Sequence, residues 1–218
     1  MKFTIGYINH NKEVFDRCLG PSLSALRGDF EVISTTDEKF PAENYNHILD
    51  ESTNEWIILT HQDISFSPDL LEKIELTIKT LDEANIKYSA LGLVGRDYDS
   101  ESYTVHWSTV DKIYRLETCD CCFIAIPKSN SIRFDEENFD EYHLYVEDYC
   151  MAANQLGGIY TIGGINGAES KLIDSSKLPL SYMLHHSATV NERGCAWGRY
   201  YEYKERLWKK WNKKVKTT

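Results

Sequence analysis

Hydrophobic and polar residues are grouped along the first half of this chain in alternating blocks. Short apolar runs at residues 3–8, 30–34, 56–59 and 90–94 have the length of buried strands. Longer segments between them carry apolar residues three or four positions apart, which is the spacing of an amphipathic helix. Strands that alternate with helices are typical of βαβ units and a parallel sheet. The first half therefore predicts an α/β fold.

Three helices are predicted between these strands. The first runs from Glu13 and is expected to end near Gly20–Pro21, and the second covers residues 43–51. The third is long and opens at Pro68, because proline is well tolerated at the start of a helix. Its apolar positions are Leu70, Leu71, Ile74, Ile78 and Leu81.

The second half of the chain is less regular. The strand at 90–94 is expected to close at Gly95–Asp97, and a polar loop is expected at residues 97–109. No internal repeat or low-complexity linker is present. The remaining predicted elements are strands around Arg115 and at residues 123–126, a helix from about Glu147 to Leu156, and a strand at residues 159–162.

Composition limits the class of protein. The 218 residues, of which 42% are hydrophobic, suffice for one sizeable domain. The net charge of −10 would repel a phosphate backbone, so nucleic acid is not an expected partner. We predict one domain over residues 1–196 and a basic, aromatic helix or tail over residues 197–218. No apolar stretch is long enough to span a bilayer and no secretory signal is evident, so a cytoplasmic location is expected.

The tract from Trp197 to Trp211 alternates aromatic residues with Lys and Arg. Such a helix could lie on an anionic membrane surface, at the inner face of the membrane, that carries a lipid-linked acceptor. It could equally pack its aromatic side chains on the domain. Glu202 and Glu205 favour packing, because they supply ordinary ion pairs within a helix.

Six cysteines are expected to be free thiols, because the chain carries no secretory signal. Cys119, Cys121 and Cys122 lie in one strand-like segment, where residues 119 and 121 share a face and residue 122 points the other way. One tetrahedral zinc ion could not easily use all three together with His185 or His186. Small buried hydrophobic residues are the favoured interpretation.

Asp63 is the most informative polar residue. It follows the apolar run at 56–59, and ligands of open α/β sheets bind outside the carboxyl ends of the strands. A carboxylate in that place is suited to a divalent cation that also contacts phosphates. The alternative is that Asp63 caps the next helix, but Ser67–Asp69 offers a better cap.

Five motifs occur in an order that matches a known enzyme family. They are Ala42–Asn46; His61–Ile64; Thr118–Asp120 with Phe123–Ile126; the block Phe134–Glu136, Tyr142–Tyr145 and Glu147–Cys150; and His185–Ser187. Together they resemble a small bacterial glycosyltransferase of the family-2-like group. The resemblance implies a single Rossmann-like, nucleotide-sugar-binding GT-A domain with a mixed central sheet. His61–Asp63 is similar to the group's His-Gln-Asp version of its Asp-x-Asp metal motif.

The resemblance implies that a sugar moves from a nucleotide-diphosphate donor to an acceptor hydroxyl, on a carbohydrate or lipid-linked acceptor, in cell-surface glycan synthesis. A UDP-sugar is the favoured donor, and inversion is expected because a carboxylate base activates the acceptor directly. Mn²⁺ or Mg²⁺ is the expected cofactor, held by Asp63 with His185 or His186. Gln62 occupies the middle of the motif, which leaves one acid there.

The expected catalytic base is one of three carboxylates. Asp148 aligns better with the family's acid, Glu147 is the second candidate and Asp120 the third. Cys121 follows Asp120 where the family usually has glycine, which changes the backbone freedom of that turn. Donor nucleoside contacts are expected at the ends of the first two strands and in the helix at 43–51, although Asn and Tyr commonly end strands for purely structural reasons. These residues are Tyr7, Asn9, Asp37, Asn44 and Asn46, and Gln62, after the third strand, is a further expected contact.

Two other functions fit parts of the sequence. A nucleotidyltransferase that makes nucleotide sugars would need a Gly-rich phosphate loop with a basic residue, and Gly6–Asn9 supplies none. A non-catalytic nucleotide-sugar-binding protein would keep the fold without the base, and the presence of Asp63 with Glu147–Asp148 argues against it. The oligomeric state is left open by the sequence.

Overall fold

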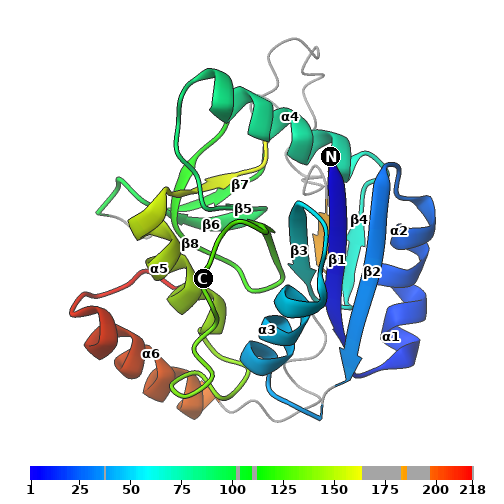
Figure 1. Ribbon diagram of the computed structural model, residues 1–218. Helices are drawn as coiled ribbons and strands as arrows, with labels where there is room; N and C mark the ends of the chain where they lie inside the picture. Colours follow the sequence, from blue (N-terminus) through cyan, green and yellow to red (C-terminus); the bar gives the residue numbers. More distant parts are fainter. Residues whose placement is uncertain (37, 102–103, 110–111, 164–182, 186–196, 218) are drawn as a thin grey trace.

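A computed structural model describes residues 1–36, 38–101, 104–109, 112–163, 183–185 and 197–217. Helices and strands alternate through the first half, as predicted (Figure 1). The helices are α1 (Lys12–Arg17), α2 (Leu19–Ala25), α3 (Pro41–Glu51), α4 (Leu70–Glu83), α5 (Tyr145–Leu156) and α6 (Trp197–Trp211). The strands are β1 (Lys2–Asn9), β2 (Asp29–Thr36), β3 (Trp56–Thr60), β4 (Ile64–Phe66), β5 (Ala90–Gly92), β6 (Val94–Asp97), β7 (Val105–Trp107), β8 (Arg115–Cys119), β9 (Phe123–Pro127), β10 (Ile159–Thr161) and β11 (Met183–His185).

The described strands form one large mixed sheet and a small second one. The large sheet has nine strands in the order β2-β1-β3-β9-β5-β10-β8-β6-β7, and β4 pairs with β11. β1 is parallel to β2 and β3, and β10 is parallel to β5. β9 is antiparallel to its neighbours β3 and β5, and β8 is antiparallel to β10 and β6. The predicted α/β class with a mixed central sheet is confirmed.

Helices cover both faces of the sheet because its central strands are apolar on both sides. In β3, Ile57 and Leu59 face a core shared with α3 and α5, whereas Trp56 and Ile58 face a core shared with α2 and α4. All five residues of β3 are buried. Such a continuous apolar run is what a strand needs when helices pack on both faces.

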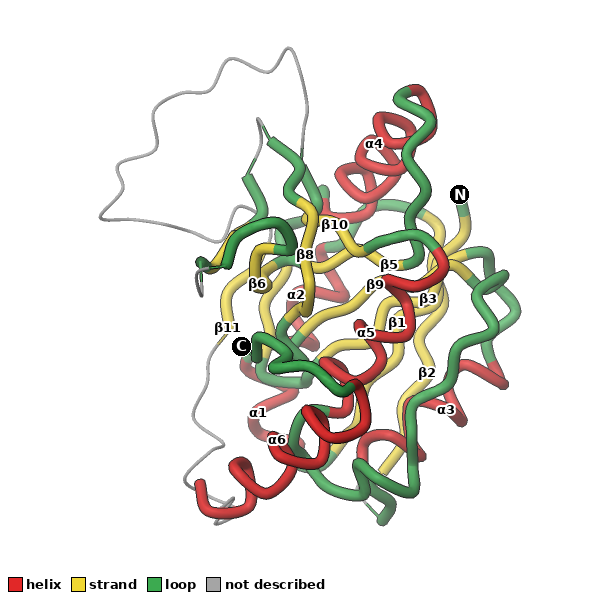
Figure 2. The backbone as a smooth tube through the Cα atoms, turned by 90° about the vertical axis from the view of Figure 1, so that its left-hand side faces the viewer, coloured by secondary structure: helices red, strands yellow, loops and turns green. Residues whose placement is uncertain are grey.

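Helix α6 packs beside α5 on the first of these cores (Figure 2). Tyr203 and Leu207 are fully buried there, and Val215, beyond the end of the helix, is buried with them. Lys209 on the opposite side of α6 is exposed. None of the helices in the described ranges is long and apolar enough to cross a lipid bilayer.

Two predicted boundaries are wrong. The first helix was expected to end at Gly20–Pro21, but the break lies at Cys18, and both residues belong to the first turn of α2. Proline is tolerated in a first turn because the N–H groups there have no partner within the helix.

Residues 90–97 form two strands rather than one strand closed by a turn. β5 and β6 lie at different places in the sheet, and Gly95–Asp97 belongs to β6 instead of ending a strand. A Cβ atom on Gly95 would lie 2.2 Å from the Thr118 carbonyl oxygen, so close packing against β8 explains this glycine. Within the described residues of the expected loop at 97–109 lies a short strand, β7, and β4 was not predicted.

The three clustered cysteines do not lie in one strand. Cys119 ends β8, whereas Cys121 and Cys122 lie in the turn before β9. Cys119 and Cys122 are buried, as expected of small apolar side chains, and Cys121 is half-buried. All the cysteines in the described part of the chain are free thiols.

Candidate active site

The candidate site lies where several strands of the large sheet end. β1 and β3 are parallel, so their carboxyl ends, at Asn9 and Thr60, meet at one edge. β9 begins opposite Thr60, which brings the turn before β9 to the same edge. Thr60 Oγ1 and His61 N both donate to the Cys122 carbonyl oxygen, at 2.9 and 3.1 Å. We call this edge, with these turns and the start of α5, the carboxyl edge.

Gln62 joins the turn after β3 to the loop after β1. Its side-chain oxygen accepts hydrogen bonds from the backbone N–H groups of His10 and Asn11, at 3.1 and 3.2 Å. Its amide nitrogen lies 2.9 Å from His10 Nε2. Because Gln62 is buried, these bonds fix the two loops at the carboxyl edge before any ligand binds.

Asp63 is buried at the carboxyl edge, with His61 beside it. His61 Nδ1 lies 3.8 Å from Asp63 Oδ1, and His61 Nε2 lies 3.3 Å from the hydroxyl of Tyr145, the first residue of α5. The side chain of His61 is 30% exposed, compared with 4% for Asp63. His61 therefore connects the acid to the start of α5 and to solvent.

Residue 185 comes close to Asp63 through backbone pairing. His185 in β11 is paired with Ile64 of β4, the residue that follows Asp63. Two residues of the expected metal set are therefore close along the backbone: Asp63 immediately precedes β4, and His185 is paired with the first residue of β4. His186, the third, lies outside the described residues.

Asp148 faces α6. Its Oδ1 accepts a hydrogen bond from Trp211 Nε1 at 2.7 Å, and its Oδ2 accepts one from Lys210 Nζ at 2.8 Å. Burial raises the pKa of Asp148 above its ordinary value, although both of these contacts oppose the shift. Both oxygens of this carboxylate are therefore engaged within the protein.

Glu147, the residue before Asp148, is also buried in the first turn of α5. Burial, followed by the negative charges of Asp120 and Glu147, raises the pKa of the Cys121 thiol. The charge of Glu147 also contributes to a raised pKa at Tyr145, for which burial is the main cause. Cys150, one turn after Glu147 on α5, accepts a hydrogen bond at 3.4 Å from the backbone N–H of Cys119, the residue before Asp120, so α5 packs on the strand that leads to Asp120.

Asp120 is held in its turn by a local hydrogen bond. Its Oδ1 accepts the backbone N–H of Cys122 at 2.9 Å, and its own N–H donates to the Val94 carbonyl oxygen at 3.0 Å. The charge of Asp63 contributes to the raised pKa of Cys122, behind burial and Asp120. The turn at residues 120–122 thus lies beside the turn that carries Asp63, because Thr60 and His61 both bond the Cys122 carbonyl oxygen.

The expected nucleoside contacts are spread more widely. Tyr7 is buried and stacks on Phe15, with ring centroids 5.1 Å apart, and Asn9 is exposed at the end of β1. Asp37 lies outside the described residues.

The two asparagines of α3 make bonds within the protein. The Asn44 side chain donates to the Lys39 carbonyl oxygen at 2.7 Å. Asn46 bonds both the N–H and the carbonyl oxygen of Phe134, each at 2.9 Å. Among the expected contacts that the structure describes, Asn9 is therefore the most accessible at the carboxyl edge.

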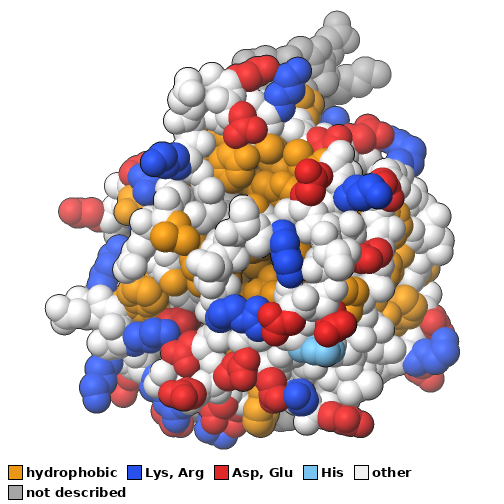
Figure 3. Space-filling model, viewed as in Figure 1, with side chains coloured by type: hydrophobic (Ala, Val, Ile, Leu, Met, Phe, Trp, Pro, Cys, Tyr) orange, Lys and Arg blue, Asp and Glu red, His pale blue; other side chains and the backbone are white. Residues whose placement is uncertain are grey.

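An open cavity of about 910 Å³ lies at the opposite edge of the sheet, where β3 begins and β9 ends. Trp56, Tyr88 and Pro127 contribute to its lining, with Ile86 and Leu156. Figure 3 shows hydrophobic side chains exposed in the hollow between α4 and the strands. This cavity contains none of the predicted site residues.

Three residues that matter at the carboxyl edge were not assigned a role from the sequence. His61 stands in the quoted motif, and its position between Asp63 and an aromatic hydroxyl shows only in three dimensions. Lys210 and Trp211 reach Asp148 across more than 60 residues of sequence. No local pattern could have identified these long-range partners.

Solved structures with the same fold include several of TarS from S. aureus. The structure of its residues 1–349 with UDP-GlcNAc gives a TM-score of 0.58 at 15% identity, covering 95% of this chain and 65% of that one. The same fragment with UDP gives 0.54 at 16% identity, covering 76% and 59%. This chain therefore spans less than two thirds of the TarS fragment. No family model matches the sequence, and no curated protein sequence is significantly similar to it.

Proposed function

We propose that this chain is a glycosyltransferase that takes a sugar from a nucleotide-diphosphate donor, with a UDP-sugar preferred. The observation that carries the proposal is the position of buried Asp63, with His61 beside it, at the carboxyl edge next to the turn that carries Asp120. Ligands of open α/β sheets bind at this edge. The likeness in fold to TarS, which has been solved with UDP-GlcNAc and with UDP, supports the choice of donor.

A divalent cation, Mn²⁺ or Mg²⁺, fits the residues present. The part of the chain that the structure describes contains no group of three or more His, Cys, Asp or Glu side chains that could hold a metal by itself. Mg²⁺ bound with nucleotides commonly uses one or two protein carboxylates and completes its shell with phosphate oxygens and water. Asp63 would supply the carboxylate, with His185 or His186 as a further ligand. When bound, the cation would offset the charge that develops on the diphosphate.

Glu147 is the proposed catalytic base. Both Asp148 oxygens accept hydrogen bonds from α6, and Glu147 is the other buried carboxylate in the first turn of α5. Glu147 takes the proton of the acceptor hydroxyl as the acceptor oxygen bonds to the anomeric carbon of the sugar. The bond from that carbon to the diphosphate breaks, and the nucleoside diphosphate leaves with the electron pair. This direct displacement inverts the anomeric configuration.

The acceptor is a hydroxyl on a carbohydrate or on a lipid-linked glycan. Asn9 contacts the donor nucleoside at the end of β1. Gln62 acts indirectly, because its hydrogen bonds hold the loops after β1 and β3 together.

The test is thermal unfolding with UDP, GDP, ADP and CDP, each with Mn²⁺ and with EDTA. A nucleotide at about 100 times its Kd should stabilise the fold by about 2.7 kcal/mol, which is roughly 5–10 °C for a chain of this size. Asp63→Asn should lose the Mn²⁺-dependent part of the shift. Asp29→Asn is the matched control, because Asp29 is exposed at the start of β2, far from the carboxyl edge.

Release of UDP from a UDP-sugar panel then separates an enzyme from a binding protein. Wild type should cleave a UDP-sugar and so produce free UDP. Glu147→Gln should bind UDP normally but cleave the UDP-sugar at least about 100-fold more slowly. If wild type binds UDP but cleaves no UDP-sugar, the result would favour the non-catalytic binding protein. No thermal shift with any nucleotide would overturn the proposed function.

A further inference from the structure

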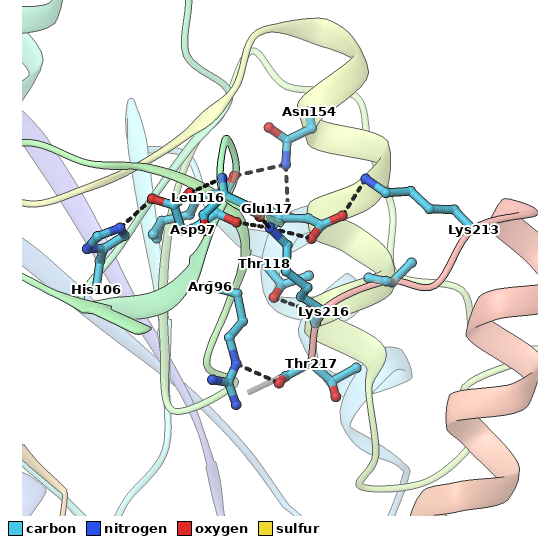
Figure 4. Close-up of polar contacts among 12 residues, drawn as sticks. Arg96, Asp97, His106, Leu116, Glu117, Thr118, Asn154, Lys213, Lys216 and Thr217 are labelled. Carbon is cyan, nitrogen blue, oxygen red and sulfur yellow. Dashed lines mark hydrogen bonds and ion pairs between the residues drawn. The ribbon is translucent and has the colours of Figure 1, made fainter. Parts of the chain in front are cut away.

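The segment that follows α6 is built into the fold. Residues 212–217, which we call the strap, run past β8 and β6 (Figure 4). Val215, Lys216 and Thr217 are buried, with exposed fractions of 0%, 8% and 3%. A buried lysine is unusual unless its ammonium group is paired, so the partners of the strap show what holds it.

A buried carboxylate anchors the strap. Glu117 of β8 is 1% exposed, and its two oxygens lie 2.5 Å from Lys213 Nζ and 3.3 Å from Lys216 Nζ. Lys216 Nζ also donates to the carbonyl oxygens of Asp97 and Ser100. Burying one charge without a partner is strongly unfavourable, so the cluster of Glu117, Lys213 and Lys216 should form or break as a unit.

Hydrogen bonds attach the rest of the strap to both neighbouring strands. Thr118 Oγ1 donates to the Lys216 carbonyl oxygen at 2.6 Å, and Arg96 Nε donates to the Thr217 carbonyl oxygen at 2.8 Å. The hydroxyl groups of Tyr200 and Thr217 lie 2.6 Å apart, which ties the strap back to α6. The strap is thus fixed at its backbone as well as at its side chains.

The anchors of the strap are close in sequence to the proposed catalytic carboxylates. Glu117 and Thr118 belong to β8, which ends one residue before Asp120. Lys210 and Trp211, immediately before the strap, hold Asp148, the neighbour of Glu147. Residues 210–217 therefore fix both the strand that leads to Asp120 and the helix that carries Glu147.

We propose that Lys213 and Lys216 are positioning residues for the transfer reaction and act through Glu117. The strap holds the end of β8 against α5, and this sets where Asp120 stands relative to Glu147 and the acceptor hydroxyl. A displacement of about 1 Å at a reacting group can lower a rate by about 100-fold, so a loose strap should slow transfer while the donor still binds. This inference rests on the proposed function.

The test compares Lys216→Met with Lys214→Met. Lys214 lies in the same strap but is exposed, and its ammonium group contacts the Trp208 ring. With the UDP-sugar that wild type hydrolyses, Lys216→Met should lower kcat about 10- to 100-fold and change KM less than about threefold. Lys214→Met should match wild type in both. Lys213→Met, which removes the more exposed of the two lysines, is the milder variant if Lys216→Met does not fold.

Hydrogen exchange gives a readout that does not need activity. In Lys216→Met the amides of residues 117–120 should exchange at least about tenfold faster, whereas those of β1 should be unchanged. Equal exchange at residues 117–120 in variant and wild type would overturn the positioning role, as would a general loss of protection that includes β1. Failure of wild type to bind any nucleotide would instead overturn the proposed function, and exchange would still decide whether the strap fixes β8.

Discussion

At the scale of single residues, Glu147 and Asp148 show how adjacent carboxylates take different roles. Both lie in the first turn of α5 and both are buried, but successive residues of a helix point about 100° apart. Asp148 accepts hydrogen bonds from the Lys210 ammonium group and the Trp211 indole N–H of α6, and Glu147 leaves the helix axis in a different direction. Because both side chains are buried, the hydrogen bonds of Asp148 to α6, and not its burial, distinguish it from Glu147, the candidate base.

The two acids should respond differently to removal of their charge. Asp148→Asn weakens charge-assisted hydrogen bonds to Lys210 and Trp211, so the free energy of unfolding should fall by about 1–3 kcal/mol. Glu147→Gln should reduce turnover much more than stability. Urea denaturation and UDP release, measured on the same preparations, check both. Full activity in Glu147→Gln with loss of activity in a folded Asp148→Asn would reverse the assignment.

Gly95 should not tolerate a side chain. A Cβ atom there would meet the Thr118 carbonyl oxygen at 2.2 Å and the Leu116 side chain at 2.8 Å. Gly95→Ala must therefore move β6 away from β8, which should cost about 1–3 kcal/mol. Val105→Ala, at a 37% exposed position paired with Arg96, is the control and should change stability by less than about 0.5 kcal/mol. Equal denaturation midpoints for the two variants would contradict this explanation.

The sequence was more informative about which residues lie near the site than about which way their side chains point. The polar cluster after a buried strand identified the turn that holds Asp63, because an abrupt end to an apolar run marks the end of a strand. Alignment with a family acid favoured Asp148, but only the packing of α6 shows that its oxygens are engaged. Which of two neighbouring helical residues faces a cleft depends on contacts that lie far away in the sequence.

At the scale of elements, one lysine of α6 bridges α5 and the segment before it. Lys210 Nζ lies 2.7 Å from Asp135 Oδ2 and 2.8 Å from Asp148 Oδ2. Burial would raise the pKa of Asp135, but hydrogen bonds from Lys210 and Asn138 outweigh it and lower that pKa to about 2. Acid should therefore weaken this attachment of α6.

The sign of the pH effect follows from the lowered pKa. An aspartate that titrates near 2 when folded and near 3.8 when unfolded binds more protons in the unfolded chain between these values. Its contribution to stability is fully present above about pH 4 and is lost as the pH falls toward 2. In Asp135→Asn the unfolding free energy should fall less steeply between pH 4 and 2 than in wild type. An unchanged slope would show that Asp135 does not contribute.

Asp16→Asn is the control for that measurement. Its ion pair with Lys12 is exposed and lies within α1, so the substitution should change stability at pH 7 by less than about 0.5 kcal/mol. Asp135→Asn should cost more at pH 7, because Asp135 also accepts hydrogen bonds in the turn at residues 135–138.

Long periodic elements were predictable, and short strands were not. The helix at 70–81 was expected from its apolar spacing, and α4 confirms it. The split of residues 90–97 into β5 and β6 was missed, because a run of apolar residues does not show that the chain moves to another place in the sheet. β4 was missed for a related reason: it has three residues and pairs with a strand more than 100 residues later.

At the scale of the whole molecule, the sheet has a protected centre and an exposed edge. β3 lies between β1 and β9 with every residue buried, whereas β2 forms one end of the sheet and its residues are half-buried or exposed. Stability to local opening should therefore be uneven across the molecule.

Hydrogen exchange of the wild-type protein tests this. Amides of β3 should exchange only through global unfolding, and their rates should rise with urea as steeply as the global transition predicts. Amides of β2 should exchange at least about 100-fold faster, with a weaker dependence on urea. Equal protection of the two strands would show that the edge is covered in solution.

The hydrogen bonds of Gln62 have a consequence for the kinetics of ligand capture. The loops after β1 and β3 are already joined in the folded chain, so their conformational entropy is lost during folding and not when a ligand arrives. A nucleotide entering there meets a preformed surface, and its association should follow a single phase whose rate rises linearly with nucleotide concentration. In Gln62→Ala the same association should reach a plateau at high concentration, because closure of the loops would then become a separate step after encounter.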